Sequence, residues 1–178
     1  MSRINCIQCG ASYPTNSNPY RCECGGCFDY QEFPKFKPGK NIGLGVWSYF
    51  DSLDQTNRSS IISLGEGNTP LLPVYLDGHQ IWLKMESSNP TGSYKDRGST
   101  ALVSHFKERG ISFAVEDSSG NAGASFAAYC AKGSIACKVF VPEAASGPKR
   151  TQIEMFGAEL VRVPGPRAEA AKAVIKEV

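Results

Sequence analysis

The chain has 178 residues, of which 41% are hydrophobic and 20% are charged, as in an ordinary folded protein with one domain or a small module plus one domain. Its net charge of +2 comes from basic and acidic residues interspersed along the chain, which argues against nucleic acid or a membrane surface as a partner. No stretch approaches the roughly 20 apolar residues of a membrane span, and the N-terminus lacks the apolar core of a signal peptide, so we expect a cytoplasmic protein.

The first segment, residues 1–30, contains five of the seven cysteines and shows little apolar periodicity. It therefore needs a cross-link, such as a bound metal ion, in order to fold. Two CxxC pairs, fourteen residues apart, predict a tetrahedral zinc site of the closed, structural kind. The ligands predicted from these pairs are Cys6, Cys9, Cys24 and Cys27. Cys22 leaves a second set open, in which Cys22 and Cys24 bind and Cys27 is spare, and a zinc ribbon that no longer binds metal is a further alternative.

Two segments between residues 31 and 80 have distinctive sequences. The stretch GVWSYFDSL (residues 45–53) is expected to be a short helix or an arm that packs Trp47, Tyr49 and Phe50 onto another part of the molecule. The stretch SLGEGNTPLLP (residues 63–73) has glycines on both sides of an acid and then an Asn-Thr-Pro turn, which by composition alone is a plain loop leading into a strand.

From residue 81 onward, strand-like and helix-like stretches alternate four times. The predicted strands are 81–86, 111–117, 136–142 and 158–164, and the predicted helices are 95–110, 121–133, 146–157 and 166–178. Leu102 and Phe106 mark the expected apolar stripe of the first helix. Strands separated by helices of this length pair in parallel, so the predicted fold class is α/β with an open twisted parallel sheet.

Ligands of such sheets bind beyond the carboxyl ends of the strands, which points to the loops NPTGSYKD (89–96) and DSSGNAG (117–123). Lys95 stands at the entrance of a predicted helix near Arg97, a setting that favours the neutral amine able to form a Schiff base with an aldehyde. The alternative is an ordinary surface lysine. The small residues of the second loop suit an anion, although Ser118 or Ser119 could instead simply cap the following helix.

Three segments, GEGNTPL, LKMESSNPTGSYKDRGST and SSGNAGASFAAYCA, occur in this order along the chain. Together they resemble the fold-type-II pyridoxal-phosphate family, whose members are similar to the tryptophan synthase beta chain, and within it the threonine synthases most closely. The stretch VFVPEAASGPKRTQIEMFGAELVRVPG continues the match, and a cysteine-bearing N-terminus followed by an arm like GVWSYFDSL is also similar to many threonine synthases.

The resemblance implies a role for individual residues. Lys95 matches the lysine that binds pyridoxal 5′-phosphate, and Asn121 matches the asparagine that hydrogen-bonds the ring hydroxyl of the cofactor. The residues that match the loop holding the substrate carboxylate are Ser118, Ser119 and Gly120. Asp96 and Arg97 match residues that we take to be mainly structural.

The reaction implied by the resemblance converts O-phosphohomoserine and water to threonine and phosphate, so the expected partner is a small-molecule amino-acid substrate. Many threonine synthases have a threonine in the loop where this chain has Ser119 and Ala122, which leaves the fine placement of the substrate open. Other fold-type-II enzymes, such as threonine deaminase, cysteine synthase or cysteate synthase, are the first alternative. A non-catalytic zinc-ribbon interaction module is the second.

The resemblance also divides the chain into a zinc-ribbon-like head (1–30), an arm and the start of a large domain (31–80), and a small α/β domain truncated at its C-terminus (81–178). No glycine-rich loop for the cofactor phosphate follows Gly133, and the chain ends in a predicted helix. We therefore expect an N-terminal fragment that does not turn over alone, from a full-length protein that could form a homodimer.

Overall fold

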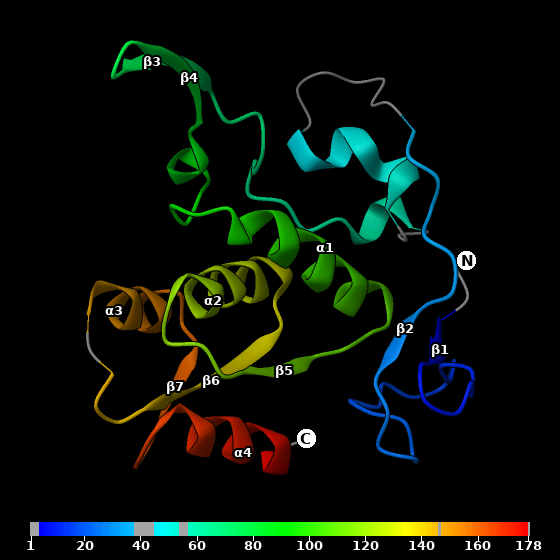
Figure 1. The fold of residues 1–178 in the computed structure, drawn as a ribbon. Helices are drawn as coiled ribbons and strands as arrows, with labels where there is room; N and C mark the ends of the chain where they lie inside the picture. Colours follow the sequence, from blue (N-terminus) through cyan, green and yellow to red (C-terminus); the bar gives the residue numbers. More distant parts are fainter. Residues whose placement is uncertain (1–3, 38–44, 54–56, 146, 178) are drawn as a thin grey trace.

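The computed structural model describes residues 4–37, 45–53, 57–145 and 147–177 (Figure 1). Its N-terminal head is built on a two-stranded antiparallel sheet of β1 (Ile4–Cys6) and β2 (Phe28–Tyr30), in which Cys6 pairs with Phe28. Within residues 4–30, Cys6 and Gly26 are the buried positions. The head therefore has almost no hydrophobic core of its own.

The arm predicted at 45–53 is a 3₁₀ helix, η1 (Gly45–Ser52), and a second short one, η2 (Arg58–Ser60), follows it. Trp47 and Phe50 are buried, as predicted, but Tyr49 is 44% exposed and does not join them. The Trp47 Nε1 donates a hydrogen bond to Thr100 Oγ1 at 2.8 Å, and that hydroxyl donates to the Ile62 carbonyl at 2.6 Å. The arm is thus attached to the α/β part of the molecule through a buried polar contact.

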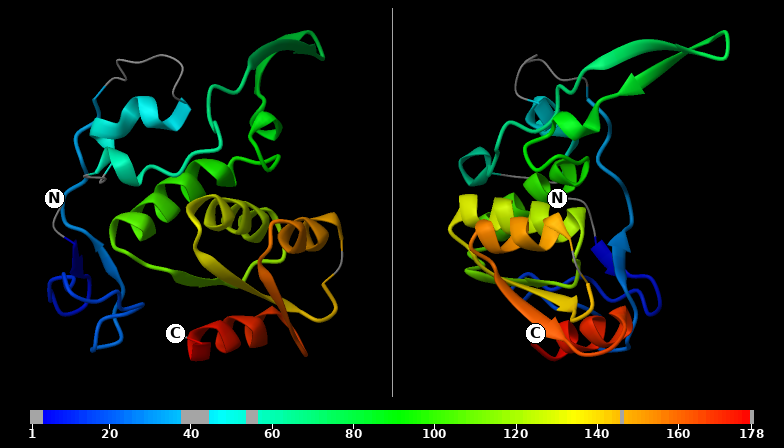
Figure 2. Two further views of the ribbon diagram at one scale, coloured as in Figure 1. Left: turned by 180° about the vertical axis from the view of Figure 1, so that it is seen from behind. Right: turned by 90° about the vertical axis from the view of Figure 1, so that its left-hand side faces the viewer.

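The strand predicted at 81–86 exists as β4 (His79–Lys84), but its placement in the parallel sheet is wrong. It pairs antiparallel with β3 (Leu71–Leu76) across a tight turn. Asp77 and Gly78 in that turn both have positive φ, the conformation of the two-residue hairpin turns that match strand twist. The hairpin projects from the rest of the molecule in both views of Figure 2, and several of its large apolar side chains are exposed.

The remaining strands form one parallel sheet in the order β5-β6-β7, with β5 (Phe113–Glu116), β6 (Ala136–Pro142) and β7 (Glu159–Val163). The helices between and after them are α2 (Asn121–Gly133), α3 (Pro148–Met155) and α4 (Arg167–Glu177). In Figure 1, α2 and α3 cover one face of the sheet and α4 covers the other. The predicted parallel α/β sheet is confirmed, with three strands instead of four.

The first helix, α1 (Lys95–Glu108), packs on α2 and not directly on the sheet. The expected apolar stripe on it is confirmed only at Phe106, which packs against the apolar cluster that contains Phe126, whereas Leu102 is 43% exposed. Its buried positions are Asp96, Ser99, Thr100, Val103 and Ser104. Since α2 already supplies the apolar side that faces the sheet, α1 can contact α2 largely through hydrogen-bonded polar groups.

The helix α2 is buried along almost its whole length, from Gly123 to Cys130. One apolar cluster joins its Phe126 and Tyr129 to Val103 of α1, and a second joins its Ala124 and Ala127 to strands β6 and β7 and to α3. This central position explains why its sequence is so rich in Ala, Gly and Ser. Within the described ranges, no helix is both long enough and apolar enough to cross a membrane.

The contact between Trp47 and Thr100 can be tested by substitution. Thr100→Val keeps the shape of the side chain but leaves the buried indole N–H without its acceptor, so we expect the free energy of unfolding in urea to fall by about 1–3 kcal/mol. Thr100→Ser keeps the hydroxyl and should lose less. Equal losses in the two variants would contradict a stabilising role for the hydrogen bond.

Candidate functional site

Lys95 is the first residue of α1, so the predicted position of this lysine at a helix entrance is confirmed. It is partly exposed, and its Nζ lies 5.0 Å from the centre of the Tyr94 ring. Gly98, one turn further along α1, has open space where a Cβ would stand. Residues three apart lie on the same face of a helix, so the lysine and the bare backbone of Gly98 share an open face.

Asp96 directly follows the lysine and is fully buried. Its carboxylate accepts hydrogen bonds from the backbone N–H of Thr91 at 2.7 Å, from the Thr91 hydroxyl, and from Ser125 Oγ at 2.6 Å. The same Ser125 hydroxyl lies 2.7 Å from Ser99 Oγ. One buried acid in the first turn of α1 therefore ties the loop before α1 to the second turn of α2.

This link places the second loop beside the first. Asn121 opens α2 and stands one turn before Ser125, on the same face of the helix. Figure 1 shows α1 and α2 side by side, beginning at the same end. Lys95 and Asn121 are thus brought to neighbouring helix N-termini, with Ser118, Ser119 and Gly120 leading into the second one.

The loop from Ser118 to Gly120 does not behave as an ordinary helix cap. The N-cap residue of α2 is Gly120, which has no side chain, so the alternative in which Ser118 or Ser119 occupies the cap position of α2 is wrong, although the Gly120 N–H donates a hydrogen bond to Ser118 Oγ at 3.4 Å. The loop lies tightly over the helix, since a Cβ on Gly123 would stand 1.9 Å from the Ser118 carbonyl oxygen. Backbone N–H groups at an uncapped helix start suit an anion such as a carboxylate.

A second network joins the first loop to the GEGNTP segment. Glu86, in the 3₁₀ helix η3 (Glu86–Ser88), forms a two-pronged ion pair with Arg97, with 2.8 Å for each N–O contact. The same carboxylate accepts hydrogen bonds from Thr69 Oγ1 at 2.9 Å and Asn89 Nδ2 at 2.9 Å. The hydrogen bonds from Arg97, and then those from Thr69 and Asn89, lower the pKa of Glu86 to about 2, against the effect of burial.

This pairing corrects one expectation about Arg97. Its positive charge was expected to act on Lys95, but the guanidinium is held by Glu86 and also donates to Thr69 Oγ1 at 3.1 Å. The charge of Arg97 is therefore compensated within this network.

Glu66, the acid of the GEGNTP segment, is fully buried. It accepts hydrogen bonds from Ser63 Oγ at 3.0 Å, from the Leu64 backbone N–H at 3.0 Å and from the Tyr129 hydroxyl of α2 at 2.7 Å. Burial, followed by this carboxylate, raises the pKa of Tyr129. A segment that by composition looked like a plain loop is thus fixed to α2, and all three motif segments meet in space.

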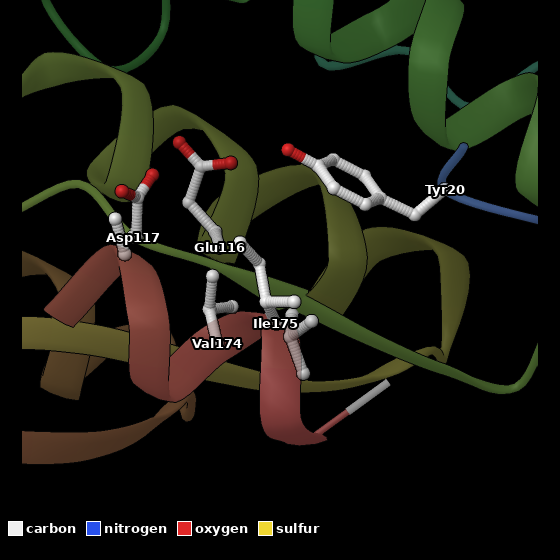
Figure 3. A pocket seen from close by; sticks show the side chains of 7 residues that line it. Tyr20, Glu116, Asp117, Val174 and Ile175 are labelled. Atoms are coloured by element: carbon white, nitrogen blue, oxygen red, sulfur yellow. The ribbon is translucent and has the colours of Figure 1, made fainter. Parts of the chain in front are cut away.

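A pocket of about 300 Å³ lies at the end of β5, on the side of α4 (Figure 3). Glu116 and Asp117 line it together with Val174 and Ile175 of α4, and Tyr20 of the head points across it. Burial, and then the nearby Asp117, raise the pKa of Glu116. This pair was not among the site residues expected from the sequence, although acids at the end of a parallel strand are a signal that could have indicated it.

In the head, four thiols gather with their sulfur atoms within 4.8 Å of one another. They belong to Cys6, Cys9, Cys22 and Cys24. Cys27 lies outside this group and accepts a hydrogen bond from Arg21 Nη1 at 3.4 Å. The structure thus favours the second of the two ligand sets considered from the sequence.

Comparison with known proteins identifies the family. The model of the family described as "Pyridoxal-phosphate dependent enzyme" matches residues 62–178, which contain all three motif segments of the site. The chain belongs to this family. The site residues fit such a cofactor, since a partly exposed lysine and an asparagine begin two helices that pack on one another, and nothing lies within 4 Å of where a Cβ would stand on Gly98 or Gly120.

Within this family, the chain is similar to threonine synthases. The chain is 38% identical to a threonine synthase of Methanocaldococcus jannaschii over 174 residues, covering 90% of this chain and 43% of that protein. It is 41% identical to a threonine synthase of Halalkalibacterium halodurans over 123 residues, covering 66% of this chain and 34% of that protein. The chain therefore spans less than half the length of these relatives.

Solved structures agree on the fold. A hydrogen sulfide-producing enzyme from Fusobacterium nucleatum superposes with a TM-score of 0.58 at 26% identity, covering 70% of this chain and 43% of that one. O-ureido-L-serine synthase superposes with a TM-score of 0.54 at 26% identity, covering 61% of this chain and 39% of that one.

The Glu86–Arg97 pair predicts a pH dependence. A carboxyl group whose pKa is lower in the folded than in the unfolded chain stabilises the fold above its usual value of 4.5, and this contribution is lost as the pH falls from there toward about 2. We expect urea-unfolding stability to fall more steeply over this window in the wild type than in Glu86→Gln. Equal slopes in the two proteins would contradict the assignment.

Proposed function

We propose that this protein acts in a reaction of the threonine synthase type, the conversion of O-phosphohomoserine and water to threonine and phosphate. The observation that carries the proposal is the convergence of Lys95 and Asn121 at two neighbouring helix starts, fixed by the buried Asp96–Ser125 contact. The likeness to threonine synthases supports this reaction over others in the family.

Each group of the site has a proposed task. The Lys95 amine holds pyridoxal 5′-phosphate, and Asn121 orients it through its side-chain amide. When bound, the cofactor supplies an electron sink for carbanions of the substrate. Lys95, once its amine is free, moves protons at the substrate carbons, because no other amine begins either of the two helices.

The loop before α2 is proposed to hold the substrate. The loop from Ser118 to Gly120 leads into the start of α2, where the first backbone N–H groups of the helix and the two serine hydroxyls can donate to an anion, which suits the substrate carboxylate. The tight approach of Ser118 to Gly123 holds this loop in one conformation. Because the loop is already ordered, binding an anion costs it little further conformational entropy.

We also propose that the head carries zinc as a structural cofactor. Four thiolates leave no open coordination position, so the ion takes no part in the reaction.

The lysine assignment is tested by trapping the cofactor. After pyridoxal 5′-phosphate is added and reduced with borohydride, we expect a visible absorption band before reduction and a modified Lys95 peptide by mass spectrometry afterwards. Lys95→Ala should lose both signals, whereas Lys132→Ala, on an exposed part of α2, should keep them. Label spread over several surface lysines, or label that persists in Lys95→Ala, would contradict the proposal.

The reaction itself is tested by genetic complementation, in which the complete natural gene that encodes this sequence is expressed. In a bacterium that lacks threonine synthase, we expect it to restore growth without threonine, and the Lys95→Ala variant to fail. The purified product should release phosphate from O-phosphohomoserine and not from O-phosphoserine, with a loss of at least about 100-fold in the variant. Growth failure of the wild type combined with phosphate release from O-phosphoserine would favour a different enzyme of the family.

A further inference from the structure

The four clustered thiols of the head have the spacing of a metal site. The Sγ atoms of Cys6 and Cys24 lie 3.5 Å apart, and those of Cys9 and Cys22 lie 3.6 Å apart. A disulfide would bring two sulfurs to about 2.05 Å, so neither pair is bonded. Four sulfurs placed 2.3 Å from a central zinc ion at tetrahedral angles would be roughly 3.8 Å from one another. The observed cluster is close to that arrangement.

Two tight turns present these thiols. In the first, the Gly10 N–H donates to the Cys6 carbonyl at 2.9 Å, and the Gln8 N–H donates to the Cys6 sulfur at 3.4 Å. In the second, the Gly25 N–H donates to the Cys22 carbonyl at 2.7 Å. Gly10 and Gly25 both have positive φ, which permits these turns. Backbone N–H groups directed at sulfur stabilise a thiolate, the form that binds metal.

Gly26 lets the two turns approach one another. A Cβ at this position would lie 2.6 Å from the Cys6 sulfur and 2.8 Å from Gln8 Cβ. Any larger residue would therefore push the second turn away from the first. The close approach has no apolar core to drive it, because Cys6 is the only buried apolar side chain within residues 4–30.

We propose that Cys6, Cys9, Cys22 and Cys24 bind one zinc ion, that Cys27 is not a ligand, and that the ion holds the head in the shape that docks on α1. This deepens the zinc proposal made above and is independent of the pyridoxal-phosphate reaction. Cys27 is left outside because Arg21 holds its sulfur and also donates to the Gly25 carbonyl at 3.0 Å. The second knuckle is thus a CxC pair, and not the CxxC pair that the spacing favoured.

The docking contact comes from the loop between the two knuckles. Arg109, at the C-terminal end of α1, donates through Nη2 to the Ser17 carbonyl at 2.9 Å and to the Thr15 carbonyl at 3.3 Å, and through Nε to Asn18 Oδ1. Its guanidinium also lies 5.6 Å from the centre of the Tyr13 ring. Because both ends of this loop are fixed by the thiols, loss of the metal should release Arg109.

Single Cys→Ser variants of the purified, reduced chain test the ligand set. We expect about one zinc per chain in the wild type and in Cys27→Ser. In Cys22→Ser, the zinc content should fall at least tenfold after dialysis against a weak chelator. Replacing zinc with Co²⁺ should give intense thiolate-to-cobalt absorption in the wild type and in Cys27→Ser, weakened in Cys22→Ser. Loss of zinc in Cys27→Ser with retention in Cys22→Ser would overturn the ligand set, and a metal-free wild type without cobalt bands would overturn the site.

Hydrogen exchange tests the docking. Removal of zinc should raise amide exchange in residues 4–30 and around Arg109, while strand β6 stays protected. Unchanged exchange around Arg109 would overturn the docking role. Borohydride trapping at Lys95 in the Cys22→Ser variant separates the two proposals, since it should persist where metal binding is lost.

Discussion

The buried carboxylate of Asp96 is the interaction on which the arrangement of the site depends. It accepts hydrogen bonds from Thr91 before α1 and from Ser125 in α2, and it directly follows Lys95. A buried charge is stable only when such partners surround it, and removing one of them leaves the others unsatisfied. The start of α1, which carries the lysine, can therefore take few positions relative to the start of α2, which carries the asparagine.

Two further acids fix neighbouring segments through hydrogen bonds in the same way. Glu86 holds Arg97 and the Thr69 end of the GEGNTP segment, and Glu66 holds Tyr129 from within that segment. Polar networks that are fully satisfied fix geometry more sharply than apolar contacts, which tolerate sliding. This explains why α1 can have a polar buried face and still be well placed. The exposed apolar hairpin β3–β4 contacts these networks at its base, where Lys84 donates a hydrogen bond to the Thr69 carbonyl.

The sequence predicted the helices and strands after residue 95 closely, because each carries local signals. Helix α2 and strand β6 have the predicted bounds, and Gly110 and Gly157 follow the ends of α1 and α3. The partner of strand β4 was not predictable from its apolar run, since such a run indicates a strand but not its neighbour. The Asp77–Gly78 turn is a sequence signal that could have indicated the hairpin.

The motif positions of the candidate site could be read from the sequence, but the contacts that hold them in place could not. Lys95 and the loop from Ser118 to Asn121 could be singled out from motifs, because the chemistry needs those residue types. The long-range contacts of Asp96, Glu66 and Tyr129 span many residues and leave no local pattern. The sulfur cluster that favours Cys22 over Cys27 likewise depends on where Arg21 and the turns lie, and not on the spacing of the cysteines.

We infer that the two helix starts form one binding site for pyridoxal 5′-phosphate. The most direct measurement is a titration of the ¹⁵N-labelled chain with this cofactor, followed by backbone amide chemical shifts. We expect the amide signals of residues 91–98 and 118–123 to shift together, with one common affinity. The signals of strand β7 and of the head should not shift. Shifts confined to one of the two segments, or different affinities for the two, would contradict it.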